Sequence, residues 1–108
     1  MLFAFSSIAA AQDSRTDSVW VNGNCGMCKK TIEKNATAAG ATLASWNKTT
    51  KYLQLTYDPA KTNPSVIQQA IAKAGYDTQD MKAQEADYLA LEGCCQYDRT
   101  KLPPAKEK

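Results

Sequence analysis

Hydrophobic residues along the chain follow two periods, and the changes between them mark out successive elements. Alternating apolar and polar side chains predict strands over residues 18–22, 43–46 and 51–57. Apolar residues three or four positions apart predict helices over residues 28–39 and 64–74, each followed by a glycine. Residues 76–81 are predicted to form a short edge strand. The resulting order βαββαβ indicates an α+β fold.

The chain continues beyond this unit with a further amphipathic segment. Residues 83–92 are predicted to form an added C-terminal helix, which Gly93 ends directly before Cys94 and Cys95. The division we expect is a partial signal peptide over residues 1–11, a flexible stretch over 12–17, a domain over 18–82, a helix and Cys-Cys extension over 83–98, and a disordered tail over 99–108.

The first eleven residues are uncharged and mostly apolar, and they end in three alanines before a polar stretch. This pattern is typical of the end of a signal peptide, although the basic segment that usually opens one is missing. A disordered apolar N-terminus is the alternative. The run is too short to span a bilayer, which takes about 20 apolar residues. We therefore expect a periplasmic or otherwise exported protein that is not embedded in the membrane.

Composition and charge narrow the range of functions. The 108 residues include 13 basic and 11 acidic side chains, and a formal charge of +2 is too weak for a nucleic-acid-binding surface. The chain has no histidine, so it lacks the commonest metal ligand and the usual general base. Paired carboxylates in a cleft, a serine nucleophile motif and a phosphate-binding glycine loop are also missing from the sequence. We therefore do not expect an enzyme.

The four cysteines form one CxxC motif, Cys25 and Cys28, and one adjacent pair, Cys94 and Cys95. A CxxC at the start of a helix lies beside free backbone N–H groups and the positive end of the helix dipole, which favours thiolate. Lys29 adds positive charge there. Two thiolates suit Cu(I) or Hg(II), whereas a closed zinc site takes four ligands. The motif predicts a site for Cu(I) first, with Hg(II) or Zn(II) as alternatives.

The CxxC is followed in order by Ile32-Glu33, residues 40–47, Tyr57-Asp58-Pro59 and Ala74-Gly75-Tyr76. Through these segments, residues 19–81 resemble the heavy-metal-associated domain family, which includes copper chaperones and periplasmic mercury-binding proteins. The resemblance implies a ferredoxin-like βαββαβ sandwich, here with an added C-terminal helix, and metal carried by the two motif cysteines. It also implies ligand exchange with a partner such as a metal-transporting membrane protein or an efflux component. The chain would be a monomer or a metal-bridged dimer.

Two residues near the motif have open roles. The family usually has a methionine two positions before the first cysteine, where this chain has Gly23. Met27 is predicted either to replace that methionine as a core plug, to offer a thioether to Cu(I), or to face solvent with neither role. In the family Tyr76 falls in a loop against the metal loop, where it would shield the site or only pack.

The second cysteine pair is predicted to reach the first. The predicted strand over residues 76–81 runs away from the metal loop for about 20 Å, and a ten-residue helix returns about 15 Å. We expect at least one of Cys94 and Cys95 near Cys25 and Cys28, as a further thiolate or a disulfide partner. The alternatives are pairing with other molecules or burial as small hydrophobic residues.

Two other functions remain open from the sequence. The motif Cys25-Gly26-Met27-Cys28 also resembles the CGxC of thioredoxin-like proteins, which favours a thiol-disulfide oxidoreductase. Alternatively, the four cysteines would form two bridges that stabilise a small exported domain.

Overall fold

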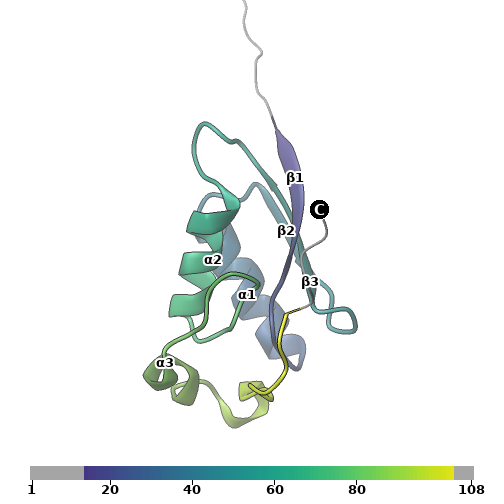
Figure 1. The fold of residues 1–108 in the computed structure, drawn as a ribbon. Helices are drawn as coiled ribbons and strands as arrows, with labels where there is room; N and C mark the ends of the chain where they lie inside the picture. The colour runs from purple at the N-terminus through teal and green to yellow at the C-terminus, as the bar shows by residue number, and fades with distance from the viewer. Residues whose placement is uncertain (1–13, 104–108) are drawn as a thin grey trace, which may run out of the picture.

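A three-stranded antiparallel sheet, with two helices against one face, forms the body of the molecule (Figure 1). A computed structural model describes residues 14–103, so the predicted signal peptide lies outside the described residues. The strand order is β1-β3-β2, which confirms the predicted α+β fold. The elements are β1 Arg15–Trp20, α1 Gly26–Ala38, β2 Leu43–Trp46, β3 Tyr52–Tyr57, α2 Pro64–Lys73, α3 Glu85–Leu89 and the short 3-10 helix η1 Gly93–Cys95.

The core lies between the sheet and the helices α1 and α2. Alternate residues of β3 and one face of each helix point into it, as the sequence periods predict. The α2 helix begins as expected, because the side chain of Asn63 accepts a hydrogen bond from the Val66 N–H at 2.9 Å and Pro64 takes the first helical position. The largest fully buried side chains include Trp46, Tyr76, Tyr97, Ile32, Leu53, Leu55, Ile67 and Ile71.

The predicted strand over residues 76–81 is wrong. The segment makes only an isolated bridge between Val21 and Thr78, because other hydrogen bonds fold it into a turn. The Gln68 side-chain oxygen accepts from the Thr78 hydroxyl and the Asp80 N–H, each at 2.9 Å, and the Thr78 N–H donates to the Met81 carbonyl at 2.7 Å. These bonds occupy backbone groups that a strand would have used along β1.

Three predicted boundaries also differ from the structure. A flexible stretch is predicted over residues 12–17. In the structure β1 begins at Arg15, and residues 15–17 pair with β3. The helix predicted over residues 83–92 is shortened to the five residues of α3. The tail predicted to be disordered from residue 99 starts with an ordered arginine, since Arg99 forms an ion pair with Asp77 at 2.6 Å.

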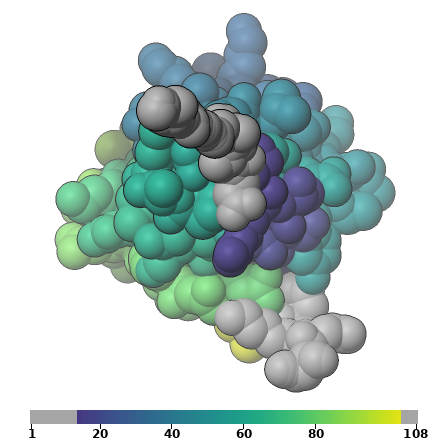
Figure 2. All heavy atoms as spheres, turned by 90° about the horizontal axis from the view of Figure 1, so that it is seen from above, coloured from purple at the N-terminus to yellow at the C-terminus, as the bar shows by residue number. Residues whose placement is uncertain are grey.

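The start of β1 and the start of α1 lie at opposite ends of the molecule. Figure 2 looks down on the end at the top of Figure 1, where the exposed start of β1 (purple) lies on the surface. The start of α1 and the η1 helix lie together at the opposite end (Figure 1). Within residues 14–103, no helix is long and apolar enough to cross a bilayer.

Candidate metal centre

Cys25 and Cys28 sit where the loop after β1 turns into α1. Cys25 has an extended backbone and directly precedes the helix, and Cys28 lies in its first turn. The two sulfurs are 3.6 Å apart, and the Asn24 N–H points at the Cys28 sulfur at 3.4 Å. The helix start therefore presents both thiols beside backbone donors, as the CxxC motif predicts.

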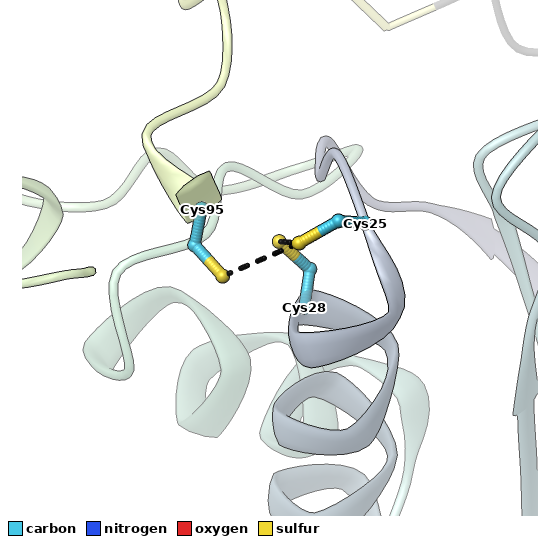
Figure 3. Close-up of side chains that lie close together, drawn as sticks. All are labelled: Cys25, Cys28 and Cys95. Carbon is cyan, nitrogen blue, oxygen red and sulfur yellow. Dashed lines mark hydrogen bonds between the residues drawn. The ribbon is translucent and has the colours of Figure 1, made fainter. Parts of the chain in front are cut away.

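Cys95 brings a third sulfur to this pair from the far end of the chain. Its Sγ lies 3.8 Å from the Cys25 Sγ, and the sulfurs of Cys25, Cys28 and Cys95 all lie within 4.8 Å of one another. Figure 3 shows the three side chains pointing toward one another from the loop, α1 and η1. Cys28 and Cys95 are buried and Cys25 is half-buried.

The spacing of the sulfurs suits one ion held by all three. With a metal–sulfur bond of about 2.3 Å, the sulfurs of a planar three-coordinate site stand about 4.0 Å apart and those of a linear site about 4.6 Å. The separations of 3.6 and 3.8 Å are well below the linear value and suit an ion held by three or more ligands. The donor set, three thiols without nitrogen or oxygen, is that of a soft, thiophilic ion.

The local environment makes Cys25 more acidic than an ordinary thiol. The backbone N–H of Cys28 interacts with the Cys25 sulfur and is the main reason that the pKa of Cys25 falls from 9.0 to about 7, against an opposing effect of burial. Burial raises the pKa of Cys95. It also raises the pKa of Tyr76, whose hydroxyl interacts with the thiols of Cys95 and Cys28. Tyr76 thus closes the buried side of the centre.

Solved structures similar to this chain include a metallochaperone and the N-terminal domain of a zinc(II) ATPase. The chain is 30% identical to "CopZ metallochaperone" over 59% of its own length and 98% of that chain, with a TM-score of 0.56. It is 28% identical to oxidized MerP from Ralstonia metallidurans CH34, over 61% of this chain and 94% of that one, with a TM-score of 0.58. The N-terminal domain of the zinc(II) ATPase ZiaA in its apo form is 28% identical, over 89% of this chain and 83% of that one, at a TM-score of 0.53.

The chain belongs to the heavy-metal-associated domain family. No sequence profile of a protein family matches it, and no curated protein matches it in sequence. The similar solved structures are metal-binding chaperones or transfer domains. Because the match to CopZ takes in nearly all of that protein and 59% of this chain, about two fifths of this heavy-metal-associated protein has no counterpart there.

The extension that carries Cys95 is fastened to the family domain by Tyr97. Its buried hydroxyl accepts a hydrogen bond from the Asp77 N–H and donates one to the Gly75 carbonyl, both at 2.8 Å. Its ring stacks on Tyr76 at 5.9 Å between centroids and meets Tyr88 edge-on at 4.9 Å. These contacts fix the chain two residues after Cys95, and they hold that sulfur in place.

Arg99 makes a second set of contacts that hold the extension to the domain, and the sequence pattern does not predict them. Its guanidinium binds the Asp77 carboxylate at 2.6 and 3.2 Å and the Ala83 carbonyl at 2.7 Å, and it lies over the Tyr88 ring. Asp77 also accepts from the Ala83 N–H at 2.9 Å. The available signal was a tyrosine and an arginine two and four residues after Cys95, inside a stretch otherwise typical of a tail.

Met27 and Cys94 lie together on the outer rim of the centre. Met27 is 49% exposed, so it is not a core plug, and its Sδ lies 3.5 Å from the Sγ of the exposed Cys94. The Cys94 carbonyl accepts from the Asn24 side chain at 3.3 Å and faces the Cys25 sulfur at 3.6 Å. The structure therefore separates the adjacent cysteines, since Cys95 joins the buried centre and Cys94 faces solvent.

Two lysines near the loop have different partners. Lys29 turns to the Glu33 carboxylate one helical turn on and to the Trp46 carbonyl, so its charge is balanced within this group. Lys51 binds the Gly23 carbonyl of the metal loop, lies over the Trp46 ring and interacts electrostatically with Cys28. No sequence pattern singles out Lys51, which follows the β2–β3 turn and has a positive φ of 70°.

Proposed function

We propose that this protein binds and transfers a soft metal ion, with Cu(I) as its cargo and with Cys25, Cys28 and Cys95 as the ligands. The observation that carries the proposal is the grouping of three thiol sulfurs within 4.8 Å at the start of a helix. Thiolates prefer thiophilic ions to hard cations such as Mg²⁺ or Ca²⁺. The ion is cargo that the protein exchanges. Its ligands come from the start of α1 and from the C-terminal extension.

The ligand set favours Cu(I) over the two alternatives. A closed structural zinc site takes four ligands, and the sulfur of the fourth cysteine, Cys94, is exposed beside Met27 and lies outside the group of three. Hg(II) accepts low coordination by thiolates and is the first alternative, in keeping with the likeness to MerP. Zn(II) is the second alternative.

Delivery to another protein is the role that we propose for the bound ion. The relatives are named as a metallochaperone and as domains of P-type ATPases, which supports a metal-transporting membrane protein or efflux component as the partner. The apolar, alanine-ended first eleven residues support an exported, periplasmic location. Transfer would proceed by exchange of sulfur ligands, without an enzymatic step.

A competition titration tests the proposal. The reduced protein, kept without oxygen, would be titrated against a coloured Cu(I) chelator, and then against Hg(II) and Zn(II). We expect one Cu(I) per chain and weaker uptake of Zn(II). The double variant Cys25→Ser, Cys28→Ser should lose uptake, while Ser65→Ala, an exposed change on α2 away from the sulfurs, should keep it. No uptake by the unchanged protein at micromolar Cu(I) would refute the proposal.

A thiol-disulfide oxidoreductase is the second candidate, favoured by one observation. Cys25 has a pKa of about 7 and two further thiols within reach, which are features of redox-active cysteines. Its test is the reduction of insulin by the reduced protein. Catalytic turnover together with no affinity for Cu(I) would favour this function, whereas stoichiometric oxidation alone would not.

A further inference from the structure

The three-cysteine centre is closed to a partner at two of its three sulfurs. Cys28 has no exposed surface and Cys95 is 3% exposed, with Tyr76 beside them on the inner side. Ligand exchange needs an incoming sulfur to reach the ion while an outgoing sulfur leaves it. Only Cys25 of the three is partly open, so the buried centre alone offers a narrow route for transfer.

The rim holds a second pair of sulfurs beside that route. Cys94 Sγ and Met27 Sδ are 3.5 Å apart and both face solvent. Met27 lies between Cys25 and Cys28 in sequence, and Cys94 directly precedes Cys95. The Cys94 backbone is held against the metal loop by the Asn24 side chain, with its carbonyl 3.6 Å from the Cys25 sulfur. A side chain fixed there can reach an ion bound by Cys25.

We propose that Cys94 and Met27 form an exchange pair, a thiolate and a thioether through which Cu(I) enters and leaves the three-cysteine centre. This inference rests on the proposed function. Thiolate and thioether ligands together select Cu(I), whereas zinc sites in proteins are built from thiolate, imidazole and carboxylate ligands. The pair would thus favour passage of Cu(I) over Zn(II).

The exchange step moves one ion and no electrons. Cys94 gives up its thiol proton and its sulfur binds the Cu(I) held by Cys25, with Met27 as a neutral ligand. The bond between Cu(I) and Cys95 breaks, and Cys95 takes up a proton. The ion remains Cu(I), the number of protein-bound protons is unchanged, and the ion now faces the partner. A partner thiolate then replaces Cys94, which takes up the proton released by the partner's thiol, and the neutral Met27 leaves. Further partner thiolates replace Cys28 and Cys25 in the same way, so that every bond between the ion and this chain breaks and the ion passes on as Cu(I).

Transfer kinetics test this inference on the full chain. Reduced protein loaded with one Cu(I) would be mixed with excess bicinchoninate, and formation of the coloured Cu(I) complex would be followed by stopped flow. We expect Cys94→Ser and Met27→Leu each to slow the release by about tenfold, the lower range of effects for residues that support a metal site. Equilibrium affinity for Cu(I) should be unchanged in both variants, because neither side chain binds the resting ion.

Two further variants separate the exchange pair from the resting ligands. Met81→Leu, the same change at a methionine outside the centre, should leave the rate unchanged. Cys95→Ser should weaken affinity and speed release. Wild-type release rates in both rim variants would overturn the inference, and so would a loss of affinity in Cys94→Ser equal to that in Cys95→Ser. Uptake with unchanged rates would overturn this inference alone, whereas no uptake by the unchanged chain would overturn the proposed function too.

Discussion

Cys25 is the one sulfur of the three-cysteine centre that solvent reaches, and its chemistry should follow its lowered pKa. The thiolate is the reactive form, so alkylation depends on how much of Cys25 is ionised. With a pKa of about 7, Cys25 is mostly thiolate above pH 7 and mostly protonated below it. We expect its alkylation by iodoacetamide, measured on the reduced metal-free protein by peptide mass spectrometry, to reach half its maximal rate near pH 7. A midpoint near 9, the ordinary value, would contradict the described environment.

Sequence alone predicts the residues of the motif better than their neighbours. Cys25 and Cys28 follow from the CxxC at a helix start, which is a local pattern. The partners of Lys29 do not follow from the sequence, because its ammonium could turn toward the thiols or toward Glu33 one helical turn on. In the structure it binds Glu33 and the neighbouring Trp46 carbonyl. The contact of Met27 with Cys94 is likewise hidden from the local sequence, because the two residues are 67 positions apart.

Gly75 joins two elements, the end of α2 and the C-terminal extension. Its φ of 110° is unfavourable for any other residue, and an added Cβ would lie 2.7 Å from the Asp87 carbonyl in α3. We expect Gly75→Ala to cost about 1–3 kcal/mol from backbone strain, with a further loss from displaced α3. Thermal unfolding should show the lower stability, and the Cu(I) titration should show affinity reduced toward that of Cys95→Ser.

Gly93→Ala is the matched control for this change. It is the same substitution within the extension, and an added Cβ there meets nothing within 4 Å. Equal melting temperatures for the two variants would show that the contact between Gly75 and Asp87 does not hold the extension.

The sequence predicts the helices and strands that have a local pattern. It misses the segments whose structure depends on contacts with residues far away in the sequence. Both helices α1 and α2 and the strands β2 and β3 follow from periodicity and their end signals. The pattern over residues 76–81 predicts a strand, but hydrogen bonds to the Gln68 side chain in α2 hold this segment in a turn. The residue that holds the extension, Tyr97, has partners 20 and 22 residues away, which no local pattern reveals.

In the whole molecule, a bound ion would join parts of the chain that are 70 residues apart, Cys25 and Cys95. A cross-link over such a loop is worth about 4 kcal/mol through the lost entropy of the unfolded chain. We therefore expect Cu(I) to raise the melting temperature of the wild-type protein more than that of Cys95→Ser, which keeps only the local CxxC pair. Differential scanning calorimetry on matched metal-free and loaded samples measures both shifts.

Ser65→Ala serves as the control for this comparison, and its shift should equal that of the wild type. Equal shifts in wild type and Cys95→Ser would mean that the ion does not bridge the two ends of the chain. In that case the extension would be held by contacts that do not involve the ion, such as those of Tyr97 and Arg99.

Trp46 gives the protein a built-in optical reporter. Its buried indole donates to the Val21 carbonyl at 3.0 Å and lies so close to the metal loop that a Cβ at Gly23 would be 3.0 Å from the ring. A heavy, polarisable ion two residues further along the loop would quench the emission of this chromophore. Loading and unloading could then be watched in real time by intrinsic fluorescence, without a dye and without altering a single sulfur.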